Sequence, residues 1–390
     1  MPDPKLMLRY PRISDLIPRA SRRIPRFAWG YLNHGQGRET LLRDNTGAFD
    51  RVRLGQTVLN DLGTPDTSAQ VLGQTHAFPF GISPVGLTSM MWPGGEKLLA
   101  RVASETGIPM TLSCVANARL EDIAPLATTG LWFQLYALED PVPRLDLVRR
   151  AEAAGVETLV VTIDVPVTSR REFASVSGLP ARGRLTPRMM AQAMLCPEWG
   201  LRTLHRGRPD FVNFRPYVPD GASFTDLGDF AASNLGRRVT PAEIEEIRAV
   251  WPGKLVIKGV MSAQDARRAL DLGADALWIS NHGGRQSDAV MPALDALVAL
   301  RESFADTPLI LDSGVRSGLD VLRALRLGAD FVFLGRSWFY GMGAIGPRGA
   351  QHVADILAAE LSYSMRQLGV PDLRRETLNR LDVIMSDPTS

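Results

Sequence analysis

Short apolar runs alternate with helical patterns from residue 78 onward, and this alternation constrains the fold more than any other feature of the sequence. Nearly continuous hydrophobicity in pieces of five to seven residues is typical of buried parallel strands. Eight such strands with helices between them favour an α/β fold of the (β/α)8 (TIM) barrel type over an open sheet. The predicted strands are residues 78–83, 108–113, 131–136, 158–164, 254–259, 276–280, 308–312 and 331–335.

An internal repeat supports the barrel. Residues 262–275 (SAQDARRALDLGAD) align with residues 317–330 (SGLDVLRALRLGAD). Each copy starts with a serine that can cap a helix and ends in Gly-Ala-Asp before the next apolar run. The neighbouring segments do not share this period, so the repeat predicts two equivalent strand–helix units within one domain, residues 1–390, and not a solenoid.

Two segments lie outside the alternation. Residues 1–77 precede the first barrel strand and are expected to form a helical segment. Residues 172–238 form a long insertion after the fourth strand, rich in Arg, Pro, Met and aromatic residues. A connection of this length is usually a functional lid or an interaction segment. Its basic and apolar mixture suits a membrane surface, and it suits equally an insertion packed on the barrel or on a neighbouring subunit.

The composition argues against several classes of function. The chain has 390 residues, 45% hydrophobic and 22% charged, with a net charge of +2, which is typical of a soluble globular protein and predicts no nucleic-acid partner. The two cysteines, Cys114 and Cys196, form neither a disulfide framework nor a metal-ligand spacing, which suits the cytoplasm. Pro or Arg breaks every apolar run of the first 27 residues, so neither a signal peptide nor a spanning helix is expected there.

Polar and titratable side chains follow almost every predicted strand. A (β/α)8 barrel builds its active site at the C-terminal ends of its strands, so these side chains are expected to converge. A lone histidine at a strand end is more often a hydrogen-bonded surface residue than a catalyst. A barrel face kept only for stability, however, would not need a lysine, an aspartate and a histidine together. The strand-end residues include Pro84, Val85, Gly86, Ser113, Gln134, Tyr136, Thr162, Asp164, Lys258, Ser280, His282, Arg285, Asp312, Gly314, Arg316, Gly335 and Arg336.

The last two strand ends combine glycines with arginines. The sequences DSGVR (312–316) and LGR (334–336) follow the seventh and eighth strands, where barrels of this type commonly bind a phosphate. Backbone N–H groups and a guanidinium fork suit a phosphate monoester. These two ends therefore predict a ligand that carries a phosphate.

Lys258 admits two interpretations. It is either a Schiff-base lysine or a fixed positive charge beside an electron-accepting cofactor. His282 and Arg285 favour the second interpretation. A histidine base beside an arginine that clamps a carboxylate suits proton removal from a hydroxy acid, while the lysine stabilises negative charge on the acceptor.

Together these residues resemble the FMN-dependent L-2-hydroxyacid dehydrogenase/oxidase family, which includes lactate and mandelate dehydrogenases and glycolate oxidase. The resemblance runs from about residue 10 to about residue 372. The motif SNHGGRQ (280–286) is highly specific for that family, and WFQLY, LVVTIDVPV, VIKGV, DSGVR and FLGR occur in the family order. The resemblance implies FMN as the cofactor, a small 2-hydroxy acid as the substrate and a homotetrameric assembly.

The resemblance also implies a role for each substrate-side residue. His282 corresponds to the catalytic base, and Asp164 to the carboxylate that stabilises its imidazolium form. Arg285 corresponds to the main clamp on the substrate carboxylate, with Tyr31 and Arg171 assisting.

The remaining positions correspond to hydroxyl and cofactor contacts. Tyr136 would hydrogen-bond the reacting hydroxyl or its oxyanion, and Lys258 would lie by the N1 edge of the flavin. The other implied cofactor positions are Pro84, Val85, Gly86, Ser113, Gln134, Thr162 and Ser280 around the isoalloxazine, and Asp312, Gly314, Arg316, Gly335 and Arg336 at the ribityl and phosphate groups.

The sequence departs from the family pattern at several positions. His34, Gln36 and Ser313 stand where a small residue, Ala and a second Gly are common. Val115 replaces the Trp of glycolate oxidase, which widens the pocket and argues against glycolate as the sole substrate. Gly86 lies, by resemblance, near flavin N5, where oxidases tend to have Ala and dehydrogenases often have Gly. We therefore expect the electrons to pass to a quinone or a respiratory carrier.

Three alternatives stay open from the sequence: an oxidase that uses O2, an enzyme for a larger 2-hydroxy acid or a peptide-derived substrate, and a non-catalytic flavin-binding module. The complete set of His282, Asp164, Arg285 and Tyr136 argues against the last. The segment 182–217 lies where mandelate dehydrogenase carries its membrane-contacting insertion. The expected location is the cytoplasm, with peripheral contact to the inner face of the membrane as an option.

Overall fold

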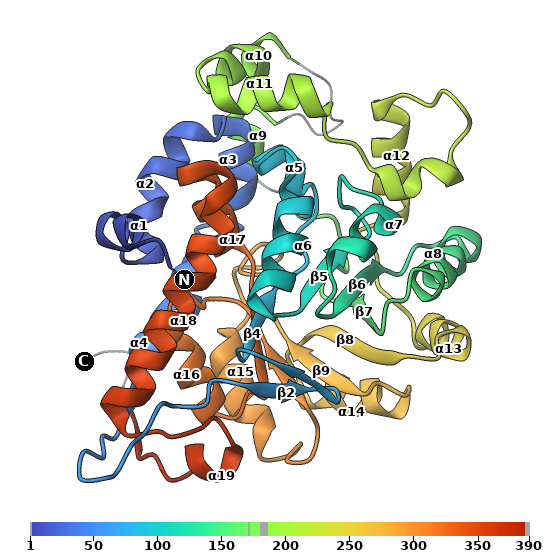
Figure 1. Ribbon diagram of the computed structural model, residues 1–390. Coiled ribbons are helices and arrows are strands. Elements are labelled where there is room, and N and C mark those ends of the chain that lie inside the picture. The colour runs from blue at the N-terminus through green and yellow to red at the C-terminus, as the bar shows by residue number, and fades with distance from the viewer. Residues whose placement is uncertain (1, 171, 180–185, 387–390) are drawn as a thin grey trace.

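Eight parallel strands form a closed barrel in the order β10-β11-β4-β5-β6-β7-β8-β9 (Figure 1). The computed structural model describes residues 2–170, 172–179 and 186–386. Each barrel strand lies within a predicted apolar run, except that β8 extends one residue beyond its run, so the predicted (β/α)8 barrel is confirmed. The barrel strands are β4 (Phe80–Ile82), β5 (Met110–Ser113), β6 (Leu131–Tyr136), β7 (Thr158–Thr162), β8 (Lys254–Val260), β9 (Ala276–Ile279), β10 (Leu309–Leu311) and β11 (Phe331–Leu334).

Large aromatic side chains fill one end of the barrel. The ring centroids of Trp278 and Phe333 are 4.3 Å apart, and those of Trp132 and Phe333 are 5.0 Å apart. Val71, from the hairpin of β2 (Ala69–Val71) and β3 (Gln74–His76), packs against this cluster. The N-terminal end of the barrel is therefore closed, and the C-terminal ends of the strands are left for a ligand.

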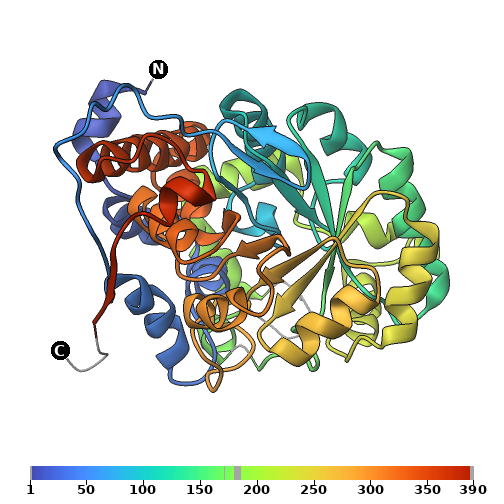
Figure 2. The same ribbon diagram turned by 90° about the horizontal axis from the view of Figure 1, so that it is seen from below.

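Helices surround the strands, as the view from below shows (Figure 2). The two repeat helices are confirmed, because Ser262 and Ser317 cap them and Gly273 and Gly328 follow them with φ of 85° and 111°. The helices from β4 to the C-terminal region, other than those of the insertion, are α5 (Thr88–Met91), α6 (Gly95–Thr106), α7 (Leu120–Ile123), η1 (Ala124–Leu126), α8 (Pro141–Ala153), α13 (Pro241–Val250), α14 (Ala263–Asp271), α15 (Ala293–Arg301), α16 (Gly318–Arg326), α17 (Arg336–Ile345), η3 (Gly346–Arg348), α18 (Gly349–Leu368) and α19 (Arg375–Leu378).

The N-terminal segment is helical only in its first part, so the prediction of a helical segment over 1–77 is wrong for its second part. Beyond the helices, β1 (Val52–Leu54) pairs antiparallel with β12 (Val383–Met385), and β2 pairs with β3. The partner of β1 lies at the other end of the chain, and no local pattern reveals such a partner. The helices are α1 (Pro4–Arg9), α2 (Ile13–Arg23), α3 (Arg26–Asn33) and α4 (Thr40–Asp50).

The predicted insertion after the fourth barrel strand is confirmed, and it consists of short helices. It stands beyond the C-terminal ends of the strands, with α10 and α11 at the top of Figure 1. Trp199 of α11 anchors it, because its Nε1 donates to the Met90 carbonyl and its ring packs edge-on against Phe27. No helix in the described ranges is both long and apolar enough to cross a membrane. The insertion helices are α9 (Glu172–Ser177), α10 (Pro187–Met194), α11 (Pro197–Arg206), η2 (Val212–Tyr217) and α12 (Phe224–Asn234).

Candidate active site

A cavity of about 980 Å³ opens at the C-terminal ends of the barrel strands. It brings together most of the residues that the sequence singles out, although they come from segments far apart in the chain. Arg171, predicted to assist the clamp, lies outside the described residues. The predicted residues that line the cavity are Tyr31, Pro84, Val85, Gly86, Gln134, Tyr136, Thr162, Lys258, His282, Arg285, Asp312, Gly314, Arg316, Gly335 and Arg336.

Three predicted residues stand behind this lining and hold it in place. Ser113 Oγ donates to Gln134 Oε1 at 2.6 Å, and Ser280 Oγ accepts from Lys258 Nζ at 2.6 Å. Asp164 Oδ1 lies 2.9 Å from His282 Nδ1. All three therefore orient side chains that line the cavity.

The histidine–aspartate pair is built for one orientation of the imidazole. Because Nδ1 faces Asp164, the other ring nitrogen, Nε2, points toward Tyr136, whose hydroxyl lies 3.5 Å away. Burial raises the pKa of Asp164, but the charge and hydrogen bond of His282 and the charge of Lys258 outweigh it. The net effect holds the pKa of Asp164 below its ordinary value. Asp164 is therefore a carboxylate that can stabilise a protonated imidazole.

The loop of residues 280–284, here called the SNHGG loop, has an unusual backbone conformation. His282 has φ of 58°, and Gly283 and Gly284 follow with φ of 66° and 72°. A non-glycine residue in the left-handed region costs free energy and clusters at functional sites. The Ser280 hydroxyl accepts from the His282 N–H at 3.1 Å, which supports the turn. A Cβ at Gly283 would lie 2.7 Å from Arg336 Nη1, so a side chain there would displace the Arg336 guanidinium.

Arg285 and Tyr31 form the cationic part of the site. The Arg285 guanidinium lies over the Tyr31 ring, 4.7 Å from its centroid, and donates to the Tyr31 and Leu32 carbonyls. These contacts fix a delocalised positive charge at the cavity wall beside a phenol hydroxyl. A planar guanidinium in this position suits a carboxylate ligand.

A second fixed charge lies at the end of β8. Lys258 Nζ is 2.8 Å from Asp312 Oδ2, and its side chain is only 5% exposed. Ser313 Oγ donates to Asp312 at 2.8 Å and accepts from the Gly283 N–H at 3.0 Å. Ser313 has φ of 76°, which glycine adopts more easily, so its hydroxyl bridge explains how serine is accommodated there.

Several buried polar atoms of the cavity lining suit a polar ligand. Gln134 Nε2, Thr162 Oγ1 and Ser83 Oγ are buried and have no hydrogen-bond partner among the described residues. Buried polar groups are nearly always paired, so these atoms fit the polar edges of a flavin. Arg316 and the glycine-rich ends after β10 and β11 fit its phosphate. The residues present therefore fit FMN.

The Arg336 guanidinium is already hydrogen-bonded to the protein backbone. Burial lowers its pKa to about 9. Its guanidinium donates to the Leu32 carbonyl at 2.9 Å and the Gly283 carbonyl at 3.0 Å. The side chain thus ties α3 to the SNHGG loop while it lines the cavity.

The sequence analysis did not single out two residues that support the site. Asn45 of α4 and Asn281 exchange side-chain amide hydrogen bonds of 3.0 and 2.7 Å. Both residues are buried, and the pair holds α4 against the loop that carries His282. The position of Asn281 inside the SNHGG motif is the sequence signal that could have indicated this role.

The family departures His34 and Gln36 both contact the start of the insertion. The His34 ring stacks on Phe173 with 4.2 Å between centroids, and its Nδ1 lies 2.9 Å from Glu39 Oε1. Gln36 Nε2 donates to Glu172 Oε1 at 3.1 Å. These residues therefore hold α9 against the loop between α3 and α4.

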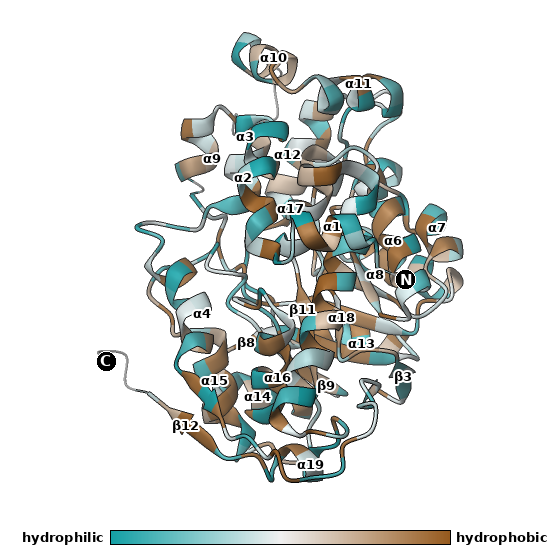
Figure 3. Cartoon of the chain, turned by 60° about the vertical axis from the view of Figure 1, so that its left-hand side comes forward, coloured by the Kyte–Doolittle hydropathy of each residue, from teal (hydrophilic) through white to brown (hydrophobic). Residues whose placement is uncertain are grey.

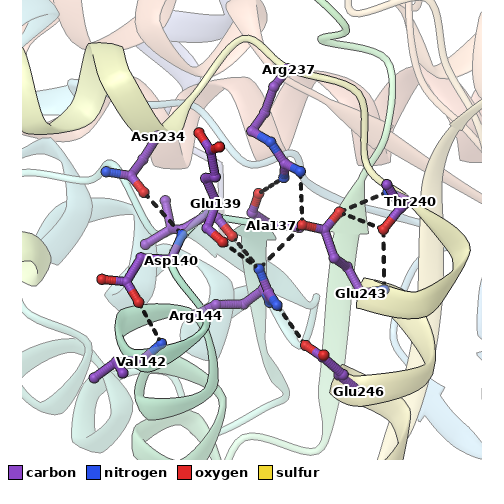
Figure 4. Close-up of polar contacts among 11 residues, drawn as sticks. Ala137, Glu139, Asp140, Val142, Arg144, Asn234, Arg237, Thr240, Glu243 and Glu246 are labelled. Atoms are coloured by element: carbon purple, nitrogen blue, oxygen red, sulfur yellow. Dashed lines mark hydrogen bonds and ion pairs between the residues drawn. The ribbon is translucent and has the colours of Figure 1, made fainter.

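A charged network holds the other end of the insertion to the loop that follows Tyr136 (Figure 4). Arg237 donates to the Ala137 carbonyl at 3.1 Å and lies 2.8 Å from Glu243 Oε1. Arg144 also contacts Glu243, at 3.2 Å, and donates to the carbonyls of residues 138 and 139. The same ion pairs thus position the C-terminal end of the insertion and the strand end that carries Tyr136.

Comparisons with known proteins agree with this geometry. The FMN-dependent dehydrogenase family matches residues 20–382. The L-lactate dehydrogenase of Pseudomonas syringae pv. syringae (strain B728a) is 38% identical over 364 residues, which are 93% of this chain and 96% of that protein. The L-lactate dehydrogenase of Stenotrophomonas maltophilia (strain R551-3) is 37% identical over 373 residues, 94% of this chain and 98% of that protein.

A solved structure is similar over nearly the whole chain. The crystal structure of the monotopic membrane protein (S)-mandelate dehydrogenase has a TM-score of 0.89 and 32% sequence identity, and the match covers 95% of this chain and 98% of that one. A structure of mandelate oxidase with (S)-4-hydroxymandelic acid has a TM-score of 0.81 and 31% identity, over 97% and 99% of the two chains. With the cavity, its fit to FMN and these matches taken together, the chain belongs to the FMN-dependent dehydrogenase family.

Proposed function

We propose that the protein oxidises an L-2-hydroxy acid to the corresponding 2-oxo acid and passes the electrons to a quinone. The observation that carries this proposal is the convergence, in one cavity, of the His282–Asp164 pair, Tyr136 and Arg285. The relatives named above act on lactate and mandelate, which are both 2-hydroxy acids. When bound, FMN supplies the acceptor of the two electrons that leave the α-carbon.

The side chains supply binding and proton transfer. Arg285 and Tyr31 hold the substrate carboxylate, which orients the α-carbon toward the strand ends. Tyr136 hydrogen-bonds the substrate hydroxyl. His282 Nε2 accepts either the hydroxyl proton or the α-proton, and both routes use the same nitrogen. Asp164 stabilises the imidazolium that results, as its lowered pKa allows.

Lys258 has a different role from the base. Its charge lies in the cavity wall, bonded to Ser280 and Asp312, where it would stabilise negative charge on a bound flavin. Together with the polar lining at Ser83, Gln134 and Thr162, it would hold the isoalloxazine. Asp312, Gly314 and Arg316, with Gly335 and Arg336, would hold the ribityl chain and the phosphate, Arg336 while it stays bonded to the Leu32 and Gly283 carbonyls.

The proposed substrate carries a substituent on the α-carbon, where glycolate has only hydrogen. Val115 lines the cavity beside Gly86, and Met90 and Phe27 extend the same apolar wall. Such a wall accommodates a methyl or phenyl substituent on the α-carbon. A panel of L- and D-lactate, L- and D-mandelate and glycolate, mixed anaerobically with the enzyme, tests the proposal through bleaching of the flavin absorbance. Bleaching by an L-2-hydroxy acid is expected, and an enzyme that no member of the panel bleaches would contradict it.

We further propose that the protein binds the membrane peripherally through the apolar face of α10–α11. We define this face by five side chains that are exposed although apolar, four on the two helices that project in Figure 3 and one, Leu195, between them: Met190, Met194, Leu195, Leu201 and Leu204. Arg202 of α11 is turned away from this face, since it pairs with Glu198 at 3.2 Å and lies over the Trp92 ring, so the proposal rests on the apolar side chains. Co-sedimentation with anionic vesicles tests the proposal, and equal recovery in the supernatant with and without vesicles would contradict it.

Residues 1–390, with the N-terminal segment and the insertion 172–238, are proposed to act as a single FMN-binding unit. The homotetramer that the family resemblance implies stays a prediction, which light scattering coupled to size-exclusion chromatography would test.

A further inference from the structure

We propose that the mouth of the active-site cavity lies on the apolar face of α10–α11 and binds the lipophilic tail of the quinone. This inference rests on the proposed function and adds to it a site for the second substrate. Four residues carry it, because each lines the cavity and is also largely exposed on that face: Met190, Met194, Leu201 and Leu204. If the apolar face lies on a membrane, a cavity opening lined by these residues faces the lipid.

Apolar side chains other than those of the mouth also line the cavity. The cavity lining is mainly apolar here and includes Leu179, Met189, Ala193, Trp199 and Leu235, although Arg170 and Arg208 line the cavity as well. Met189 and Trp199 are buried, so this wall belongs to the folded interior and not to a loose surface. Methionine side chains adapt to irregular apolar ligands, which suits a flexible hydrocarbon chain.

This apolar lining of the cavity does not contribute to binding of the hydroxy acid. A small hydroxy carboxylate is bound by charge at Arg285 and gains nothing from a long apolar wall. A hydrocarbon tail, in contrast, gains free energy for each apolar contact that leaves water. The redox chemistry balances, because oxidation of the hydroxy acid releases two electrons and two protons and reduction of a quinone to a quinol consumes both.

The position of the cavity opening favours a quinone over a bulky hydroxy acid as the ligand. A water-soluble substrate would not need an entrance on a face that we propose to be covered by the bilayer. A quinone dissolved in the bilayer reaches such an entrance directly, and its tail can remain between α10 and α11 while its head lies deeper in the cavity. The occupant we assign is therefore a quinone with a hydrocarbon tail.

Leu204 and Leu195 offer a matched pair of variants. Both are leucines of the apolar face, with exposed fractions of 84% and 80%, and of the two only Leu204 lines the cavity. Leu204→Lys and Leu195→Lys should weaken vesicle binding alike. In steady-state assays without vesicles, Leu204→Lys is expected to raise the KM for a decyl-tailed benzoquinone by about tenfold. It should leave unchanged the KM for a tail-less benzoquinone and the flavin reduction by hydroxy acid.

Equal effects of the two variants on the tailed quinone, or an equal effect of Leu204→Lys on both quinones, would overturn the proposal. Met194→Lys is the second mouth variant if Leu204→Lys does not fold, because Met194 also lines the cavity and is exposed. A benzoquinone with a diazirine in its tail gives a readout that needs no turnover. Photolabelling is expected on α10 and α11, with loss of the label in excess decyl-quinone but not in excess lactate.

Labelling only at the outer residue Leu195, or labelling elsewhere on the protein, would also overturn it. If no hydroxy acid bleaches the flavin but the labelling occurs as expected, the proposed substrate fails and the quinone site stands. If hydroxy acids bleach the flavin and the labelling is absent, the quinone site fails alone.

Discussion

His282 Nδ1 lies 2.9 Å from Asp164 Oδ1, although 118 positions separate the two residues in the sequence. Asp164 follows β7 and His282 follows β9, and the barrel places both strand ends at the same rim. Gly259 makes room for the carboxylate, since a Cβ there would lie 2.5 Å from Asp164 Cβ. The pair leaves Nε2 as the ring nitrogen that can serve a ligand.

Replacement of His282, the proposed base, tests this pair. His282→Ala should retain FMN but slow flavin reduction by about 10²–10⁴-fold, the range typical of a lost general base. Asp164→Asn should also slow reduction, because an amide cannot stabilise the imidazolium by charge. Stopped-flow reduction measures both, with His205→Ala on exposed α11 as the control. Reduction of His282→Ala at the wild-type rate would rule out the assignment.

The carboxylate clamp that we propose at Arg285 would depend on the shape of the side chain as well as on its charge. Arg285→Lys keeps the charge but loses the planar fork and its position over the Tyr31 ring. We expect a higher KM for the hydroxy acid together with slower flavin reduction. Arg267→Lys, at an exposed position of α14, is the matched control. Unchanged kinetics in Arg285→Lys would show that another residue holds the carboxylate.

Gly86 and Val115 are coupled by packing. A Cβ at Gly86 would lie 2.5 Å from Val115 Cγ2, so Gly86→Ala requires Val115 to move. We expect Gly86→Ala to disturb flavin reduction and Gly86→Ala/Val115→Ala to recover much of it. We also expect reduced wild-type enzyme to be reoxidised faster by a soluble quinone than by air-saturated buffer, measured by stopped flow. Faster reoxidation by oxygen would identify an oxidase.

The network at the stem of the insertion is expected to stabilise the fold. The Arg144 side chain is 4% exposed and contacts Glu243, whose side chain is also largely buried. Arg144→Met leaves this carboxylate without one of its partners and should lower the free energy of unfolding by about 3–5 kcal/mol. Arg149→Met, on the exposed face of the same helix, should change it by less than about 0.5 kcal/mol. Equal denaturant midpoints for the two variants would contradict this role.

Glu360 predicts a pH dependence of stability. Burial raises its pKa to about 7, and the neighbouring Asp320 adds to the effect although the Gly318 N–H opposes it. A carboxyl whose folded pKa is raised destabilises the fold when it is ionised. This penalty is therefore full above about pH 7 and is relieved as the pH falls toward the unfolded pKa.

The variant Glu360→Gln removes that titration. It should be more stable than wild type at pH 8, and the difference should shrink toward pH 5. Thermal unfolding at the two pH values measures it, with Glu302→Gln at an exposed position as the control. A difference that is the same at both pH values would show that Glu360 does not titrate in this range.

The sequence by itself determined the barrel and most of the cavity wall. Burial of a parallel strand on both faces demands a continuous apolar run, so each strand and the residue that follows it can be located locally. The capped repeat at Ser262 and Ser317 is equally local, because a helix cap involves residues three positions apart.

Only the tertiary structure decided how those strand ends support one another. Ser113 and Ser280 stand behind the cavity wall, Arg336 is bonded to backbone carbonyls of α3 and the SNHGG loop, and β1 finds its partner at the other end of the chain. The mouth on α10–α11 was not visible in the sequence either. Each of these features depends on distances between segments remote in sequence, and those distances are set by closure of the barrel and by the packing of the insertion upon it.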